Sequence, residues 1–277
     1  MKPVTRIIDL LLYTSVFTAC CAAGLCMATE RLVSTVPPSY FNPLLLLVFG
    51  STLVVYNTPR LIPHPYGRQR RPQKYMAWHI AFLCIGAVLA VAALSQLSWR
   101  VRLASAALGV FAFAYYLPLL PFKNKKRLRD IGWLKIAVLA GVWTTATAIL
   151  PIIYLQKSIS DYPFEILLRF VFIFALCVVF DIRDMRADLQ NNIHTLPNAV
   201  GIRNSYRLIH TAIVLFAVLS IIQYTRYPLQ ARMAGALLTA VITWAVVYYI
   251  RRQPSDRAYL LLADGVMFFY ALMMIAV

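Results

Sequence analysis

The sequence predicts an all-helical, multi-pass membrane protein, and three observations support this fold class. Hydrophobic residues occupy 61% and charged residues 13% of the 277 positions, and the mean hydropathy is +0.70, whereas a soluble domain is about half apolar and a quarter charged. The apolar residues fall in runs close to the roughly 20 residues that span a bilayer. Runs such as "NPLLLLVFG" do not alternate in polarity as transmembrane strands do. We therefore expect helices rather than a β-barrel.

Nine apolar stretches are long enough, or nearly long enough, to cross a membrane. Between them no segment has the composition of a linker between domains, so residues 1–277 are predicted to form a single integral-membrane domain. The expected spans are 7–28, 40–57, 76–97, 102–120, 133–155, 163–180, 206–225, 230–250 and 259–277.

The distribution of Lys and Arg predicts how these helices are oriented. Basic residues in short loops tend to stay on the cytoplasmic side of a membrane. With a cytoplasmic N-terminus, 20 of the 27 Lys and Arg residues fall in inner segments. We therefore expect nine helices, a cytoplasmic N-terminus and cytoplasmic loops that carry most of the polar chemistry.

The formal net charge of +17 limits the kinds of partner that the chain can have. Its basic residues lie in loops between membrane helices, with no soluble domain to carry a nucleic acid, so nucleic-acid binding is not expected. Anionic lipid headgroups and a phosphorylated substrate suit these loops better. The five cysteines all lie in predicted spans without a C-x-x-C pair, and indicate neither a disulfide nor a metal site.

Three of the ten acidic residues lie close together in "DIRDMRADLQNNIHTLPNAVG". Asp181, Asp184 and Asp188 have the spacing i, i+3, i+7, which on a helix places them within an arc of about 60°. Such like charges repel one another unless a cation lies between them. A solvated helix end paired with Arg183 and Arg186 is the simpler alternative, but it does not explain the one-sided spacing. Oxygen ligands beside basic loops favour a Mg²⁺ and diphosphate site.

The chain resembles the UbiA superfamily of intramembrane prenyltransferases. That family has nine helices, and its second aspartate-rich motif reads D-x-x-D-x-x-x-D, followed by a "TLP" element and a glycine. These correspond here to Asp181, Asp184 and Asp188, then to Thr195-Leu196-Pro197 and Gly201. The segment "AYYLPLLPFKNKKR" is similar to the Tyr-x-Pro-Leu and basic loop of the family. The resemblance covers most of the chain and implies a UbiA-like helical bundle.

The resemblance also implies an activity and its site. Members bind an isoprenyl diphosphate through Mg²⁺ and transfer the isoprenyl group to a lipophilic acceptor. The three aspartates are then both the metal ligands and the catalytic residues. Basic and polar residues of the first cytoplasmic loops are the expected substrate-binding residues, namely Asn57, Arg60, Arg71, Lys74, Lys123 and Lys125.

One departure from the family pattern concerns its first aspartate-rich motif. Asn57 matches its leading asparagine and Arg71-Pro72 its trailing Arg-Pro, but no Asp or Glu occurs between Glu30 and Asp130. In one account, Arg and Lys replace a magnesium ion by contacting the diphosphate directly. In the other, the protein is a catalytically altered or inactive homologue that binds a phosphorylated isoprenoid or another anionic lipid.

Other charged residues in the apolar runs are weaker candidates. Arg169 and Asp264 lie inside predicted spans, where charges are rare, and each is either a substrate contact or the partner of another helix. His79 and His210 are lone histidines in helices, which we expect to be packing or hydrogen-bonded residues rather than ligands. A transporter is a third class of function, but no inverted repeat supports it.

Overall fold

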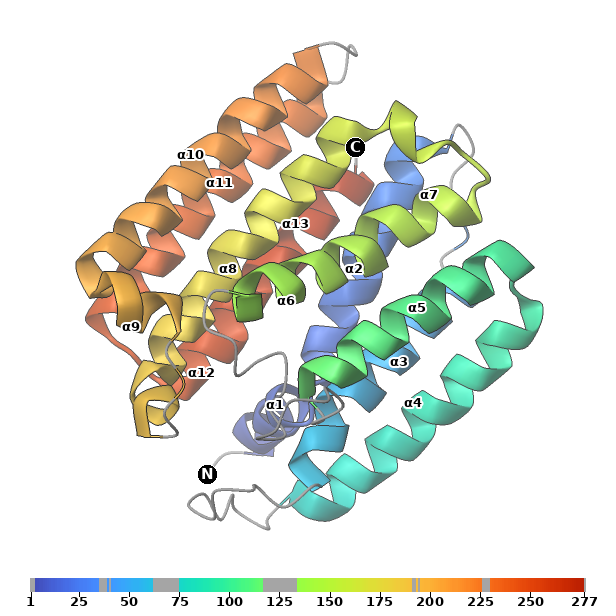
Figure 1. Cartoon of the computed structure of the whole chain (residues 1–277), viewed down its shortest axis with the longest axis horizontal. Helices are drawn as coiled ribbons and strands as arrows, with labels where there is room; N and C mark the ends of the chain where they lie inside the picture. Colours follow the sequence, from blue (N-terminus) through green and yellow to red (C-terminus); the bar gives the residue numbers. More distant parts are fainter. Residues whose placement is uncertain are drawn as a thin grey trace.

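The computed structural model of the chain describes residues 3–34, 39, 41–61, 75–116, 134–190, 193, 195–225 and 230–276. Within these ranges all regular secondary structure is helical, which confirms the predicted fold class. Long helices run side by side in one bundle, and the two termini lie near opposite ends of it (Figure 1).

Thirteen α-helices make up most of the described chain. In chain order they are α1 (Pro3–Tyr13), α2 (Val16–Val33), α3 (Pro43–Leu61), α4 (Met76–Gln96), α5 (Trp99–Tyr116), α6 (Leu134–Thr144), α7 (Leu150–Tyr154), α8 (Pro163–Gln190), α9 (Leu196–Val200), α10 (Ile202–Thr225), α11 (Gln230–Arg252), α12 (Asp256–Ala258) and α13 (Asp264–Ala276). Two π-helical turns, Thr145–Ile149 and Tyr259–Ala263, join α6 to α7 and α12 to α13, and a 3-10 turn covers Ile159–Asp161.

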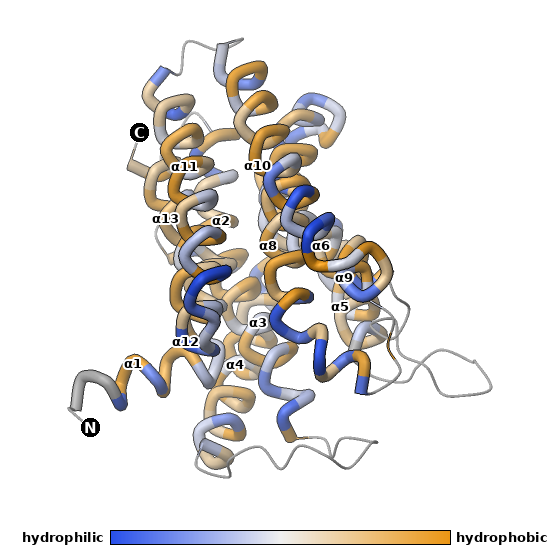
Figure 2. The backbone as a smooth tube through the Cα atoms, turned by 90° about the vertical axis from the view of Figure 1, so that its left-hand side faces the viewer, coloured by the Kyte–Doolittle hydropathy of each residue, from blue (hydrophilic) through white to orange (hydrophobic). Residues whose placement is uncertain are grey.

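Eight helical segments of the described chain are long and apolar enough to cross a membrane. They are Val16–Val33, Pro43–Leu61, Met76–Gln96, Leu134–Tyr154, Pro163–Gln190, Ile202–Thr225, Gln230–Arg252 and Asp256–Ala276. The 18-residue α5 packs against α3, α6 and α7 but is not among the eight. The total of nine spans and the cytoplasmic N-terminus stay predictions. Hydrophilic residues gather toward the helix ends and apolar residues fill the middle (Figure 2).

The first predicted span, 7–28, is not one continuous helix. It breaks between α1 and α2, where Ser15 has a left-handed backbone with φ 62°. This conformation is uncommon outside glycine and leaves carbonyls of the preceding turn without helical partners. The spanning helix therefore begins at Val16 and ends at Val33. In contrast, the sixth predicted span continues past residue 180, so that α8 carries all three motif aspartates.

Close packing between helices replaces the hydrophobic effect as the source of cohesion in a bilayer. Phe172 of α8, Phe216 of α10 and Tyr270 of α13 form an aromatic cluster with ring centroids 5.0–5.6 Å apart. On the other side of the bundle, α3 and α4 meet at two glycines. A Cβ added to Gly50 would lie 2.6 Å from the carbonyl oxygen of Gly86, and the converse distance is also 2.6 Å. These glycines let the two backbones touch.

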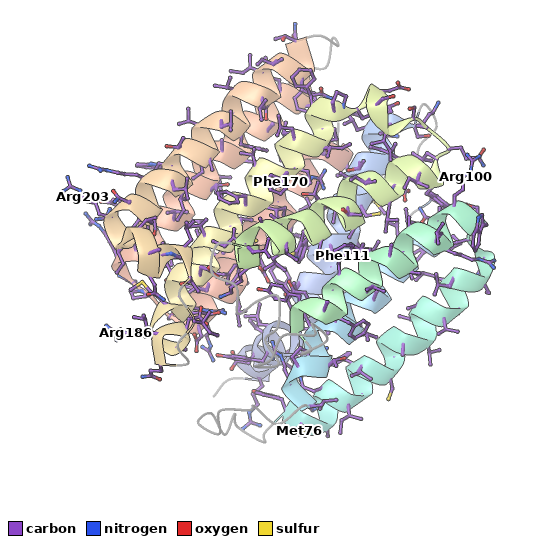
Figure 3. All side chains as sticks on the ribbon, in the orientation of Figure 1. Met76, Arg100, Phe111, Phe170, Arg186 and Arg203 are labelled. Carbon is purple, nitrogen blue, oxygen red and sulfur yellow. The ribbon has the colours of Figure 1, made fainter. Side chains whose placement is uncertain are left out.

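The C-terminal end of α8 and the N-terminal end of α6 lie at the same end of the bundle, which we call the aspartate end. Asp181, Asp184 and Asp188 lie there, as do the ends of α3 and α11 and the start of α10. Figure 3 shows Arg186 and Arg203 pointing away from the bundle near this end, whereas Arg100 lies at the opposite end.

Candidate functional site: carboxylates and a lysine at one end of the bundle

The three motif aspartates share a face of α8 but not the same surroundings. Asp181 and Asp188, two turns apart, are buried, while the carboxylate of Asp184 keeps 42% of its side-chain surface exposed. An isolated buried carboxylate is strongly unfavourable, so each must be paired. The structure pairs the two inner carboxylates with one and the same cation.

That cation is Lys135, in the first turn of α6. Its Nζ lies 2.8 Å from Asp181 Oδ1 and 2.8 Å from Asp188 Oδ2, and the side chain is 8% exposed. The ammonium thus separates two like charges that would otherwise repel each other. Asp181 Oδ2 is buried and accepts no hydrogen bond from any described residue.

Asp184 has a different partner. Arg183 Nε and Nη2 donate to its two carboxylate oxygens at 2.7 Å and 3.0 Å, in a bidentate pair. The same guanidinium lies 5.0 Å from the ring centroid of Phe180 and 5.8 Å from that of Tyr259. The local ion pair that was the simpler alternative for this segment is therefore present at Asp184. It coexists with the inward-facing pair of carboxylates on Lys135.

In the described part of the chain, no three His, Cys, Asp or Glu side chains are grouped closely enough to hold a metal ion by themselves. A divalent ion at this end would therefore share its coordination sphere with substrate oxygens or water, as Mg²⁺ commonly does. The unpartnered Asp181 Oδ2 and the half-exposed Asp184 carboxylate are the oxygens that fit such an ion. The metal and catalytic roles of the three aspartates stay predictions.

Two residues that the sequence predicts to bind substrate, Asn57 and Arg60, hold the break between α1 and α2 together. Asn57 is fully buried and donates to the carbonyls of Thr14 at 3.0 Å and Leu53 at 2.8 Å. Its Oδ1 lies 2.7 Å from Nδ1 of His79, which must carry a proton to complete this contact. The amide is thereby fully hydrogen-bonded within the protein, and His79 of α4 is its partner.

Arg60 contacts the same break. Its guanidinium donates to the Tyr13 carbonyl, and Nη2 donates to Ser15 Oγ at 3.2 Å. Carbonyl groups freed by the left-handed turn thus regain hydrogen-bond partners from α3. A contact of Arg60 with substrate stays a prediction. The other four predicted substrate-binding residues, Arg71, Lys74, Lys123 and Lys125, lie outside the described residues.

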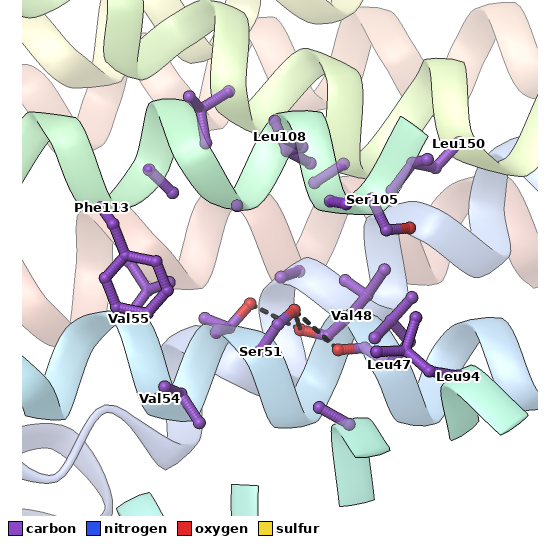
Figure 4. A pocket seen from close by; sticks show the side chains of 18 of the residues that line it. Leu47, Val48, Ser51, Val54, Val55, Leu94, Ser105, Leu108, Phe113 and Leu150 are labelled. Carbon is purple, nitrogen blue, oxygen red and sulfur yellow. Dashed lines mark hydrogen bonds between the residues drawn. The ribbon is translucent and has the colours of Figure 1, made fainter. Parts of the chain in front are cut away.

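An apolar pocket of about 340 Å³ lies between α3, α4, α5 and the α6–α7 segment. Its walls include Val48, Leu94, Leu108 and Leu150, with Ser51 and Ser105 among few polar groups (Figure 4). The hydroxyl of Ser51 donates a hydrogen bond to the Leu47 carbonyl of its own helix, at 2.6 Å. Both the size and the apolar lining are typical of pockets for small lipophilic ligands.

Two aromatic residues of the pocket wall contact each other. Tyr56 and Trp143 both line it, and Trp143 Nε1 donates to the Tyr56 hydroxyl at 3.0 Å. Their rings meet edge to face, with centroids 6.4 Å apart. Trp143 follows Lys135 on α6 by eight residues, which is about 12 Å along a helix. One helix therefore presents a cation to the carboxylates and an aromatic ring to the pocket.

The other intramembrane charges serve the bundle. Arg169 Nη2 lies 2.8 Å from Glu165 Oε1 and 3.1 Å from Thr29 Oγ1, and Nη1 donates to the Leu25 carbonyl at 3.0 Å. Asp264 Oδ2 accepts a 2.7 Å hydrogen bond from Thr18. The sequence left two roles open for Arg169 and Asp264, a substrate contact or a partner of another helix. The structure shows contacts of both residues with another helix.

Lys135 is the functional candidate that the sequence did not single out. It lies in the predicted span 133–155, inside the apolar run "WLKIAVLAG". A lone charge in such a run is the signal that could have identified it, because ionisable groups in membrane helices are usually paired or functional.

Fold and site together define a class: a polytopic helical membrane protein with acidic and basic side chains at one end and an apolar pocket between its helices. The sequence profile of the UbiA prenyltransferase family matches residues 20–272. The chain therefore belongs to the UbiA prenyltransferase family, as its second aspartate-rich motif predicted. A comparison with proteins of curated function finds no match.

Solved structures share the fold at low sequence identity. A UbiA homologue from Archaeoglobus fulgidus, bound to GPP and Mg²⁺, is similar with a TM-score of 0.66 and 10% identity, over 97% of this chain and 100% of that one. A UbiA homologue from Aeropyrum pernix K1 gives 0.61 and 15%, over 94% and 97%. A digeranylgeranylglyceryl phosphate synthase structure gives 0.55 and 13%, over 100% and 98%. These similarities establish the UbiA-like bundle.

Proposed function

We propose that the protein is a prenyltransferase that binds an isoprenyl diphosphate at the aspartate end and transfers the isoprenyl group to a lipophilic acceptor. Family membership supports the reaction class, and a structural neighbour binds GPP and Mg²⁺. The observation that carries the proposal is the position of one cation 2.8 Å from two buried carboxylates, at the polar end of an apolar bundle. The preponderance of Lys and Arg in inner segments supports a cytoplasmic location for this end.

The proposed reaction needs charge neutralisation at one end and an apolar, water-poor cavity at the other. The bond between the allylic carbon and the diphosphate oxygen breaks, and the diphosphate leaves with the electron pair. The carbon then bonds to a nucleophilic atom of the acceptor, which loses a proton. Asp181 and Asp184 would hold Mg²⁺, which supplies positive charge to the leaving diphosphate.

The chain's own residues account for the remaining requirements. The Lys135 ammonium offers further positive charge to the leaving group. The apolar pocket excludes water from the isoprenyl chain, while the faces of Tyr56 and Trp143 can stabilise positive charge on the allylic carbon. A pocket of this size suits a single flexible chain rather than a large polar substrate.

Replacing Asp184 with asparagine is expected to lower magnesium-dependent prenyl transfer by about 100-fold, because the leaving group loses much of its electrostatic stabilisation. Transfer from a series of radiolabelled isoprenyl diphosphates to lipophilic acceptors, in membranes and in detergent, measures this effect. Asp161→Asn is the matched control, since Asp161 is an exposed acid in the turn before α8. Unchanged transfer by the Asp184 variant would refute the metal-binding role.

The pocket makes a separate prediction about chain length. Gly109 lines the pocket, and a Cβ added there meets no atom within 4 Å, so the side chain of Gly109→Leu starts without a clash and is expected to reduce the cavity. In this variant, the ratio of kcat/KM for the longest isoprenyl diphosphate used to kcat/KM for a short one should fall by about 10-fold or more. Gly141→Leu, equally free of neighbours but outside the pocket lining, should leave this ratio unchanged. Equal ratios in both variants would place the isoprenyl chain elsewhere.

A second function is favoured by the absence of acidic residues between Glu30 and Asp130, which removes half of the family's carboxylates from the sequence. On that reading the protein binds a phosphorylated isoprenoid or another anionic lipid without turnover. The two functions differ in binding as well as in chemistry. Binding of geranyl S-thiolodiphosphate that depends on Mg²⁺ supports the enzyme, whereas binding that is indifferent to Mg²⁺, without transfer to any acceptor, supports the alternative.

A further inference from the structure

Lys135 lies between two carboxylates of another helix and contacts both. Its Nζ is equally close, at 2.8 Å, to one oxygen of Asp181 and one of Asp188, and all three side chains are more than nine-tenths buried. Lys135 comes from α6 and the two aspartates from α8. The ammonium is therefore held between two helices.

The hydrogen-bond capacity of the ammonium is not exhausted by these two contacts. A lysine ammonium has three N–H donors, and the two carboxylates account for two of them. The charges are also unbalanced, because two carboxylates carry two negative charges and Lys135 one positive. Asp181 Oδ2 is buried and has no partner among the described residues. Counted over the described residues alone, one donor and one acceptor thus remain at the same buried spot.

We propose that Lys135 is a resident cation that replaces one divalent ion of the diphosphate site. It fills the position between Asp181 and Asp188, leaves Asp181 Oδ2 and Asp184 to bind metal, and directs its third N–H to a diphosphate oxygen. This proposal rests on the proposed function and assigns a substrate contact within it. The first aspartate-rich motif of the family, which would bind a metal ion, is missing here. The Lys135 ammonium on α6 supplies positive charge in place of that ion.

A purely structural lysine would behave differently. It would hold α6 against α8, and its loss would affect folding without changing how many metal ions the site binds. A resident cation excludes a metal from the Asp181–Asp188 position, so its removal opens that position. The number of bound metal ions therefore distinguishes the two roles, and it does not require the enzyme to turn over.

The experiment counts Mn²⁺ bound to purified protein by electron paramagnetic resonance, with and without inorganic pyrophosphate. Lys135→Met is expected to bind one more Mn²⁺ per chain than the wild type, because two carboxylates lose their competing ammonium. Lys135→Arg keeps a cation there and should match the wild type. Lys157→Met, which removes an exposed lysine outside the spanning helices, is the control for loss of charge alone.

A second variant tests the proposal without touching the lysine. In the wild-type background, Asp188→Asn should leave the number of Mn²⁺ ions unchanged, because the Asp188 oxygen faces Lys135 rather than metal. In the Lys135→Met background, the same substitution should remove the additional ion. Loss of an ion from the Asp188→Asn single variant, or equal Mn²⁺ numbers in Lys135→Met and wild type, would overturn the proposal.

Pyrophosphate binding tests the contact with substrate. Lys135→Met should weaken pyrophosphate binding by about 10-fold in the absence of metal, as expected for loss of a charge-assisted hydrogen bond, and Lys135→Arg should restore most of it. Unchanged binding in Lys135→Met would overturn the contact. Failure of the proposed function is separable, since a chain without transfer activity would still show the change in Mn²⁺ number.

Discussion

Replacing Arg169 with methionine is expected to destabilise the protein by about 3–5 kcal/mol, the typical cost of leaving a buried charge without its partner. Arg169 is fully buried and pairs with Glu165 one turn earlier on α8. It also donates to Leu25 and Thr29 of α2, and its guanidinium lies 5.3 Å from the ring centroid of Tyr270 on α13. One side chain therefore joins three helices.

Two further variants separate the lost pair from the lost side chain. Glu165→Gln combined with Arg169→Met removes both charges and should recover much of the stability, as paired removal of buried charges often does. Arg207→Met removes an exposed arginine whose hydrogen bond to Asn204 is also exposed, and it should have little effect. Retention of monodisperse protein after heating in detergent measures all three. An Arg169→Met variant as heat-resistant as Arg207→Met would contradict the structural role of the network.

Gly50→Ala and Gly86→Ala are each expected to destabilise the protein by about 1–3 kcal/mol, because the added methyl group overpacks the α3–α4 contact. The new Cβ at Gly50 would lie 2.6 Å from the Gly86 carbonyl oxygen and 3.0 Å from the Ala90 nitrogen. These are backbone atoms, which cannot move aside as a flexible side chain can. Separation of α3 from α4 would also deform the pocket that both helices line.

The same substitution at two other glycines is the control. No atom lies within 4 Å of a Cβ added at Gly109 or Gly141, so alanine meets no obstacle there. Because alanine favours helix over glycine by up to about 1 kcal/mol, these variants should be neutral or more stable. The test is whether the two pairs of variants change heat resistance in opposite directions, as measured by the same heating assay. A similar loss at all four positions would show that backbone contact is not the cause.

The helical membrane class followed from composition and apolar run length, because burial in lipid requires nearly continuous apolar helices whatever the tertiary packing. The shared face of Asp181, Asp184 and Asp188 followed from helical periodicity, since α8 extends without interruption through Gln190. Both predictions depend on local sequence. The family also followed from this motif, because its spacing and the "TLP" element lie in one short segment.

Features that depend on contacts between distant segments could not be predicted in this way. The break at Ser15 has no proline or glycine to mark it, and Asn57 and Arg60 of α3 stabilise it. The pairing of Lys135 with α8 likewise depends on how two helices pack. The position of α5 was expected from its apolar run, but its two arginines, Arg100 and Arg102, keep it outside the set of clear spanning helices.

The role of Asn57 affects how related sequences are to be interpreted. In this protein the asparagine that heads the degenerate first motif connects the α1–α2 break, α3 and α4 through Thr14, Leu53 and His79. Selection for folding alone would retain such a residue after every neighbouring carboxylate has been lost. An isolated asparagine at this position is therefore no evidence that a metal site persists, because its hydrogen bonds within the protein explain its presence without one.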